Sequence, residues 1–198
     1  MSATTPAASP RRAELLEATY RYVLEHGVAG LSLRPLATAI GSSPRVLLFL
    51  FGSKAELVQA LLARAREDEL ELLSRLRSAC DDGDLVTVAT ELWGWLAADG
   101  HRALLTLWVE GYARSLIDPD GPWADFARAT VDDWLAVLGQ AQPPEVRDSA
   151  AGEARRTLVL AVLRGALLDL LATGELQRTS DAVTLQLSLL RAAAAHPA

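Results

Sequence analysis

Apolar residues recur every three to four positions along most of the 198-residue chain, and no stretch alternates apolar and polar residues with a period of two. This pattern predicts an all-α protein. Glycine, proline and capping residues divide the pattern into about nine helices. We expect these over residues 10–25, 33–40, 44–51, 54–80, 85–98, 101 or 102 to 117, 123–139, 145 or 147 to 173, and 179 or 180 to 195.

The stretch from residue 32 to residue 57 contains three helix starts within 22 residues. Ser32 can cap a first short helix that stops at Gly41, because glycine accepts a left-handed backbone. Ser43 and Pro44 start a second short helix, and Ser53-x-x-Glu56 forms a capping box for a long third one. Two short helices around a tight glycine turn form a helix-turn-helix, whose second helix can enter a DNA major groove.

This segment resembles the helix-turn-helix of the tetracycline-repressor (TetR) family. The matching residues are Ser32, Leu36, Ala37, Gly41, Ser43, Leu47, Phe51, Ser53, Lys54 and Leu57. The resemblance implies a homodimeric regulator that binds an operator in double-stranded DNA, usually as a repressor, and responds to a small-molecule effector. It divides the chain into a disordered tail (1–8), a DNA-binding domain (9–53) and a helical ligand-binding and dimerisation domain (54–198) that starts with a linker helix (54–80).

The helix-turn-helix offers side chains for both phosphates and base edges. Arg45 is the best candidate for reading guanine, because a guanidinium pairs bidentately with its O6 and N7, and Phe49 can touch a thymine methyl. The full predicted DNA-binding set is Ser32, Arg34, Thr38, Ser43, Pro44, Arg45, Phe49 and Lys54.

The second short helix departs from the family pattern, which usually places Tyr or His near its end. Leu48, Phe49 and Leu50 occupy those positions here, so the usual hydroxyl and imidazole donors are missing. Two interpretations follow. Either the DNA contact is unusually apolar, or the chain is a TetR-like interaction module whose apolar helix contacts a protein partner.

Charge is distributed unevenly along the chain. Residues 1–66 hold eight Lys or Arg and four Glu, a net charge of +4, so the net charge of −6 for the whole chain leaves −10 on residues 67–198. The net positive charge of the N-terminal part attracts a polyanion, whereas the acidic remainder of the chain repels it. The start of the chain lacks the apolar core of a signal peptide, and a lone Cys80 suits a reducing compartment. We therefore expect a cytoplasmic protein without a membrane span.

Aromatic residues gather between positions 90 and 135, in the three helices expected to form a central bundle. Pockets lined by aromatic side chains with a few polar anchors are typical ligand sites. The alternative is that the aromatics are simply core, and that Glu110 pairs with Arg114 one helical turn later. The predicted ligand-binding set is Trp93, Trp108, Glu110, Tyr112, Phe126, Trp134 and Arg164.

The last two helices are apolar nearly all round, so both of their sides must be covered. A second copy of the chain, related by a two-fold axis, would cover the outer side in a four-helix interface. The alternative is a central helix buried within a monomer. The predicted interface residues are Leu160, Leu163, Leu167, Leu171, Leu185 and Leu189.

An enzymatic function is disfavoured. His26, His101 and His196 lie at helix ends or in the tail, and no spacing brings them together. The sequence contains no phosphate-binding loop, nucleophile elbow, His-Glu-x-x-His zinc motif or dinucleotide-binding glycine motif. We therefore expect no enzymatic activity, no metal site and no cofactor.

Overall fold

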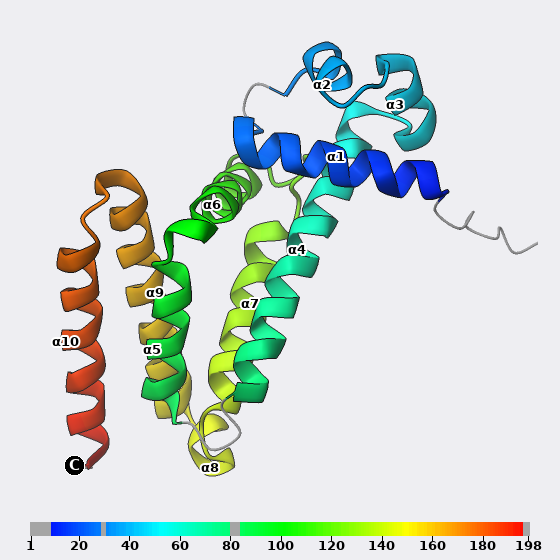
Figure 1. Ribbon diagram of the computed structural model, residues 1–198. Coiled ribbons are helices and arrows are strands. Elements are labelled where there is room, and N and C mark those ends of the chain that lie inside the picture. Colours follow the sequence, from blue (N-terminus) through cyan, green and yellow to red (C-terminus); the bar gives the residue numbers. More distant parts are fainter. Residues whose placement is uncertain (1–8, 29–30, 80–83, 196–198) are drawn as a thin grey trace, which may run out of the picture. The chain divides into compact units, whose positions relative to one another are not determined.

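The computed structural model describes residues 9–28, 31–79 and 84–195, and in these ranges the chain is helical without a β-strand. The predicted tail (1–8), Cys80 and His196 lie outside the described residues. The prediction of an all-α fold is confirmed (Figure 1). The described helices are α1 (Pro10–His26), α2 (Leu33–Ala39), α3 (Pro44–Phe51), α4 (Lys54–Ala79), α5 (Leu85–Leu96), the 3₁₀ turn η1 (Asp99–His101), α6 (Arg102–Ile117), α7 (Phe126–Gln140), α8 (Pro144–Arg147), α9 (Ala150–Thr173) and α10 (Leu176–Ala195).

Local capping chemistry explains where the N-terminal helices begin and end. The Ser9 hydroxyl accepts the Arg12 amide at 3.2 Å, and the Ser43 hydroxyl accepts the Val46 amide at 3.3 Å. These bonds satisfy amide donors that have no partner inside their own helix. Gly41 turns the chain between α2 and α3 with φ of +63°, a left-handed conformation that glycine adopts without a steric penalty.

Three helix boundaries in the C-terminal half differ from the prediction. The helix expected to start at 145 or 147 is divided, because the Ser149 hydroxyl accepts the Gly152 amide at 3.0 Å and starts α9 separately from the one-turn α8. Trp123 lies in a turn before α7, and Asp125 in that turn has φ of +61°. The last helix begins at Leu176 rather than 179 or 180, two residues after the left-handed Gly174.

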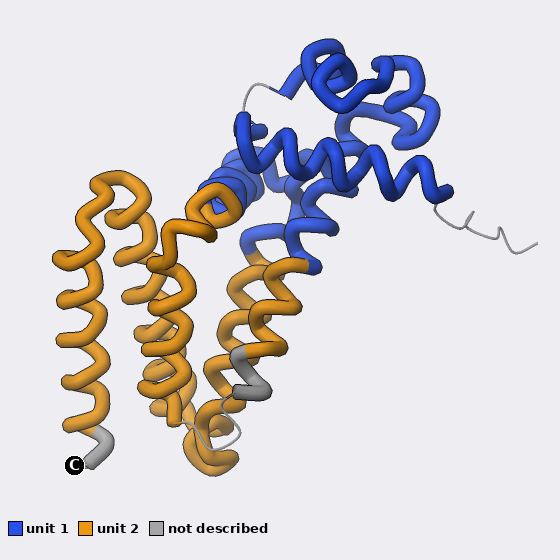
Figure 2. Tube along the Cα trace, in the orientation of Figure 1, with its two compact units in different colours: residues 1–67, 106–127 blue, residues 68–105, 128–198 orange. Residues whose placement is uncertain are grey.

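The chain forms two compact units, drawn in different colours in Figure 2. The first unit comprises residues 1–67 and 106–127. In it, α1 packs against both α2 and α3. Its core includes Leu15, Val23, Leu36, Leu47, Phe51 and Leu57, each no more than 5% exposed. The burial of these apolar side chains holds the two short helices, which are too short to be stable alone.

The second unit comprises residues 68–105 and 128–198. Here α9 and α10 form an antiparallel pair joined by a short turn, and α5 packs against both helices (Figure 1). The buried core of this unit includes Leu92, Leu138, Val159, Leu163 and Val183. The Trp93 indole N–H donates to the Ser180 hydroxyl at 3.0 Å and joins α5 to α10.

The two compact units divide the chain at other positions than residues 53 and 54, and the predicted division into a DNA-binding domain and a ligand-binding and dimerisation domain stays a prediction. Residues 106–127, which hold most of α6 and the turn after it, cluster with the N-terminal helices rather than with the C-terminal bundle. A hydrogen bond from the Val28 amide, just after α1, to the Glu110 carboxylate on α6 joins these parts of the first unit. Both α4 and α6 pass through the division, so each contributes residues to both units.

No single helix in the described ranges is both long and apolar enough to cross a membrane. Residues 44–51 and 54–75 satisfy the length and composition criteria only when taken together, as a pair bent by 70°. Nor do the described residues include a group of three or more His, Cys, Asp or Glu side chains that could hold a metal ion.

Candidate nucleic-acid interface

Helix α3 has one face in the core and the opposite face in solvent. Leu47 and Phe51 are 1% and 5% exposed, whereas Phe49 is 86% exposed. At 100° per residue, Phe49 points directly away from the midpoint of the two buried side chains, with Arg45 and Val46 beside it. We call Arg45, Val46 and Phe49 the outward face of α3.

Contacts with α1 and with its own caps fix the orientation of α3. The Arg12 guanidinium lies over the Phe51 ring at 4.8 Å from its centroid, an attractive cation–π geometry. Pro44 occupies the first position of the helix, and the Gly52 amide donates to the Leu48 carbonyl at 2.9 Å at its end. The outward face of α3 is therefore presented by a helix that is held on its other side and at both ends.

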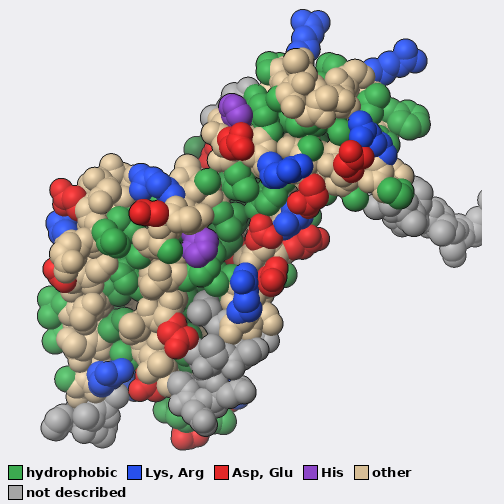
Figure 3. Space-filling view, in the orientation of Figure 1, with side chains coloured by type: hydrophobic (Ala, Val, Ile, Leu, Met, Phe, Trp, Pro, Cys, Tyr) green, Lys and Arg blue, Asp and Glu red, His purple; other side chains and the backbone are tan. Residues whose placement is uncertain are grey.

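The predicted DNA-binding residues all lie on α2, α3 and the helix starts around them, within the first unit. Ser32, Arg34, Thr38, Arg45, Phe49 and Lys54 are exposed, and Ser43 and Pro44 are half-buried. Residues 31–54 contain three basic side chains and no acidic one. Figure 3 shows basic side chains projecting from the part of this unit that carries α2 and α3.

Three hydroxyl groups of this region differ in how the fold uses them. Ser32 holds the cap position of α2, but its side chain makes no capping hydrogen bond there, contrary to the expected cap. Ser43 does cap α3, and the Thr38 hydroxyl donates to the Arg34 carbonyl at 3.1 Å. The hydroxyl of Ser32 is therefore not engaged in starting its own helix.

The predicted ligand-binding residues are divided between the two units. Trp108, Glu110, Tyr112 and Phe126 belong to the first unit, and Trp93, Trp134 and Arg164 to the second. The four residues Trp93, Trp108, Phe126 and Trp134 are buried. A Cβ on Gly111 would lie only 2.7 Å from the Trp123 ring and 3.0 Å from the Phe126 ring, so both aromatics pack tightly against α6.

Glu110 has a structural role within the first unit. One carboxylate oxygen accepts the Val28 amide at 3.2 Å, and the other pairs with the Arg114 guanidinium at 2.9 Å. The alternative interpretation, a pair with Arg114 one turn later, is confirmed. These contacts already occupy both oxygens of the carboxylate that we predicted to be a ligand anchor.

Sequence reasoning missed Glu69, a fully buried carboxylate on α4. It accepts a hydrogen bond from the indole N–H of Trp134 on α7, and both residues belong to the second unit. A signal was available, because Glu69 follows Leu62 and Ala65 and precedes Leu72 in the apolar stripe of α4. A carboxylate at a core position of an amphipathic helix is either paired or functional.

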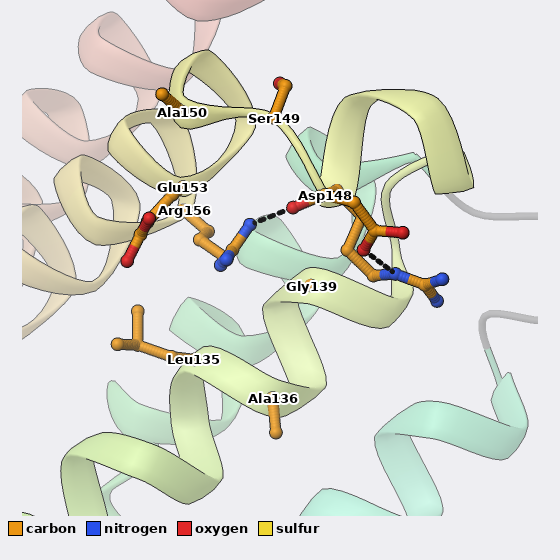
Figure 4. A pocket seen from close by; sticks show the side chains of 9 residues that line it. Leu135, Ala136, Gly139, Asp148, Ser149, Ala150, Glu153 and Arg156 are labelled. Carbon is orange, nitrogen blue, oxygen red and sulfur yellow. Dashed lines mark hydrogen bonds and ion pairs between the residues drawn. The ribbon is translucent and has the colours of Figure 1, made fainter.

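The second unit contains a cavity that none of the predicted ligand-binding residues lines (Figure 4). It measures about 540 Å³ and is lined by Leu135, Ala136, Gly139, Arg147, Asp148, Ser149, Ala150, Glu153 and Arg156. Arg156 donates to the Arg147 carbonyl at 2.7 Å, and Arg147 pairs with Asp148 at 3.0 Å. None of the seven predicted ligand-binding residues lines this cavity or a smaller one of about 80 Å³ near the α9–α10 turn.

The predicted interface leucines differ in their burial within the single chain, and the interface itself stays a prediction. Leu160, Leu163 and Leu167 are buried within the chain's own core, and Leu171 is half-buried. Leu185 and Leu189 on α10 are exposed, at 61% and 56%. The helix is apolar all round, so the sequence did not reveal which side faces α5 and α10. The exposed side of α9 carries Leu158, Ala161, Gly165 and Leu168.

Comparison with known proteins identifies the N-terminal segment. Residues 15–61, from α1 into α4, match the model of "Bacterial regulatory proteins, tetR family". The chain is 31% identical over 94 residues to the HTH-type transcriptional regulators Rv1816 of Mycobacterium tuberculosis (strain H37Rv) and Mb1846 of Mycobacterium bovis. Each match covers 46% of this chain and 40% of the relative's length.

Solved structures extend the likeness to nearly the whole chain. The multidrug binding protein EbrR, solved in complex with imidazole, is 26% identical with a TM-score of 0.63, and the match covers 94% of both chains. A TetR-family regulator from Rhodococcus sp. shares the fold with a TM-score of 0.70 at 17% identity, over 91% of this chain and 98% of the other. Residues 15–61 therefore match the TetR family of bacterial regulatory proteins, and nearly the whole chain shares the fold of the compared structures.

Proposed function

We propose that this regulator binds double-stranded DNA through α2 and α3, with the outward face of α3 in the major groove. The observation that carries the proposal is the exposure of Arg45, Val46 and Phe49 on a helix whose other face is held by α1. A groove-reading helix needs such an exposed, rigidly supported face. Arg45 supplies the donor for a base edge, and Ser32, Arg34, Thr38, Ser43 and Lys54 supply groups for phosphates.

We infer that the DNA-binding form is a homodimer. The exposed sides of the neighbouring helices α9 and α10 carry Leu158, Leu168, Leu185 and Leu189, and exposed apolar side chains gathered on two packed helices favour an interface. In a dimer with a two-fold axis, α9 and α10 of one copy would pack against α9 and α10 of the other. This gives a closed four-helix interface. A dimer would bind a palindromic operator with half-sites about one helical turn apart.

We further propose that a small, largely apolar or aromatic ligand releases the protein from its operator, so that the protein acts as a repressor. Trp93, Trp134, Glu69 and Arg164 supply aromatic and charged groups within the second unit. EbrR was solved in complexes with imidazole and with proflavin, which makes proflavin a suitable probe. Such a ligand would bind more tightly to a conformation of the dimer in which the two DNA-binding domains do not match the spacing of the half-sites. The difference between its affinities for the two conformations sets how much DNA binding is weakened.

The proposal is tested by fluorescence anisotropy on a labelled duplex from upstream of the protein's own gene. Binding is compared with a random duplex at low and at physiological salt, using the full chain and the Arg45→Ala variant. We expect sequence-dependent binding that the substitution weakens. Equal binding to both duplexes by both proteins would contradict a DNA contact through α3 at that site. Addition of proflavin in the same assay tests whether an aromatic ligand lowers the affinity.

A further inference from the structure

We propose that Phe49 reads the methyl groups of thymine, so that the operator is recognised partly through an apolar contact at the centre of α3. The inference deepens the proposed function and rests on it, because it requires that α3 lies in the major groove. It identifies the chemical group on the bases, the C5 methyl of thymine, that the outward face of α3 would recognise.

The outward face of α3 has an apolar centre. Phe49 is 86% exposed, and Val46 beside it is 37% exposed. Neither side chain carries a polar atom, so Arg45 is the one residue of this face whose side chain can donate a hydrogen bond to a base. The apolar side chain with the largest exposed fraction on this helix is thus one that cannot hydrogen-bond to a donor or an acceptor.

Only one of the four bases offers an apolar group in the major groove. The C5 methyl of thymine projects there, whereas the other base edges present donors and acceptors. A phenyl ring at the centre of the face therefore discriminates among bases through this methyl. Each methyl group removed from water gains free energy, whereas placing the ring against an unmethylated edge leaves polar groups without partners.

Charge favours DNA as the partner of this apolar face. The exposed residues Arg34, Arg45 and Lys54 lie on α2, on α3 and at the start of α4, and residues 31–54 contain no Asp or Glu. Positive charge close in sequence to an apolar centre suits a groove, whose two edges are lined by phosphates and whose floor carries the base edges. An apolar protein partner would not need this one-sided charge.

The test compares duplexes that differ only in methyl groups. The full-length chain first enriches binding sequences from a library of duplexes with a random central segment. The enriched duplex is then synthesised with thymine or with uracil at each T position of the selected site. We expect the uracil form to bind about fourfold more weakly for each methyl group that Phe49 contacts. The Phe49→Ala variant should bind both forms equally, because it lacks the ring that contacts the methyl group. The two proteins and two duplexes form a double-mutant cycle, which isolates the free energy of this contact.

Leu48→Ala is the matched control. Leu48 lies on the same helix and is partly exposed, but it points to the flank of the outward face, so this variant should keep the wild-type preference for thymine. A second duplex carries 5-methylcytosine in place of a cytosine at a contacted position. Comparing its affinity with that of the unmethylated duplex tests whether a methyl group alone strengthens binding.

The outcomes separate the inference from the proposed function. Enrichment of a specific sequence that the wild-type chain binds equally well with uracil would overturn the methyl contact and leave DNA binding intact. A thymine preference that persists in Phe49→Ala would also overturn it. Failure to enrich any sequence would overturn both and turn attention to a protein partner for α3.

Discussion

The Glu110 carboxylate on α6 accepts the backbone N–H of Val28, which lies 82 residues earlier, just after α1. Val28 is buried, so its amide depends on this carboxylate for a partner. The second carboxylate oxygen pairs with Arg114 at 2.9 Å. One side chain thus joins α6 to the end of α1 inside the first unit, the same unit that carries the candidate DNA-binding helices.

Replacing Glu110 should destabilise the protein through the loss of this bond. Glu110→Leu removes the acceptor of a buried amide, which costs about 1–3 kcal/mol of unfolding free energy. Glu110→Gln keeps a carbonyl oxygen that can accept from Val28 and should cost less. Urea unfolding followed by circular dichroism measures both differences.

Arg114→Gln serves as the control, because it removes only the ion pair. That pair is between partly exposed groups one turn apart and contributes little, about 0.3–0.5 kcal/mol. If Arg114→Gln cost as much as Glu110→Leu, the stabilisation would come from the ion pair and not from the bond to Val28.

Gly111→Ala should destabilise the same region for a steric reason. The added methyl would lie 2.7 Å from the Trp123 ring, so the packed aromatics have to move. Overpacking of this kind costs about 1–3 kcal/mol, more than the helix-propensity gain of alanine. Gly94→Ala in α5 is the matched control, because its methyl would meet nothing within 4 Å and should stabilise the helix. A higher thermal midpoint for Gly111→Ala than for the wild type would contradict the tight packing.

The helix pattern of the N-terminal half was predictable because its signals are local. Ser9, Gly41 and Ser43 determine ends through contacts within three or four residues, and the structure follows them closely. The start of α10 was missed because Thr179 resembles a cap in sequence. Its hydroxyl instead donates to carbonyls of the preceding turn, at Glu175 and Leu176, inside a helix that has already begun.

The candidate sites were less predictable because they depend on which side of a helix faces its neighbours. Helix α9 is apolar on every side, so periodicity could not tell the buried Leu163 from the exposed Leu168. Helix α3 was different, because Leu47 and Phe51 are among the residues that match the TetR pattern, and the structure buries both. That placement fixes Phe49 on the opposite side. Glu69 was missed because its partner, Trp134, lies 65 residues away in sequence.

Asp84 provides a pH-dependent contribution to stability. Its carboxylate accepts the Thr87 amide at 2.8 Å at the start of α5, and this hydrogen bond lowers the pKa of Asp84 below its usual value. A carboxyl whose pKa is lower in the folded state stabilises the fold above its unfolded pKa. It loses that effect as the pH falls through its folded pKa.

We therefore expect Asp84→Ala to lower the free energy of unfolding by about 0.5–2 kcal/mol at pH 7. The difference from the wild type should shrink as the pH falls below about 4, where the Asp84 carboxyl of the unfolded chain takes up a proton before that of the folded chain does. Urea unfolding of both proteins between pH 7 and pH 3 measures this. A difference that stayed constant down to pH 3 would mean that the charge of Asp84 contributes nothing to the cap.

Arg45 and Lys54 should affect DNA binding in different ways. Arg45 lies on the outward face of α3, so Arg45→Ala should weaken binding about 5- to 100-fold and relax the preference at one base pair. Lys54 is exposed at the start of α4, where it can reach a phosphate. Lys54→Ala should weaken all sequences alike and reduce the salt slope by about 1. Anisotropy titrations at several salt concentrations separate the two effects, and identical behaviour of the variants would argue against base reading by Arg45.

The proposed dimer predicts that charge on the exposed side of α10 produces monomers. Leu185→Glu places a carboxylate on a surface where the side chain is 61% exposed in the single chain and would be buried between two copies. An unpaired buried carboxylate is costly, so association should weaken strongly while the fold of each chain persists. Leu70→Glu, at a 45% exposed leucine on α4, is the control and should leave the oligomeric state unchanged. Light scattering after size-exclusion chromatography measures the mass. A dimer that survived Leu185→Glu would exclude α10 as the interface, and a wild-type monomer at micromolar concentration would exclude the dimer itself.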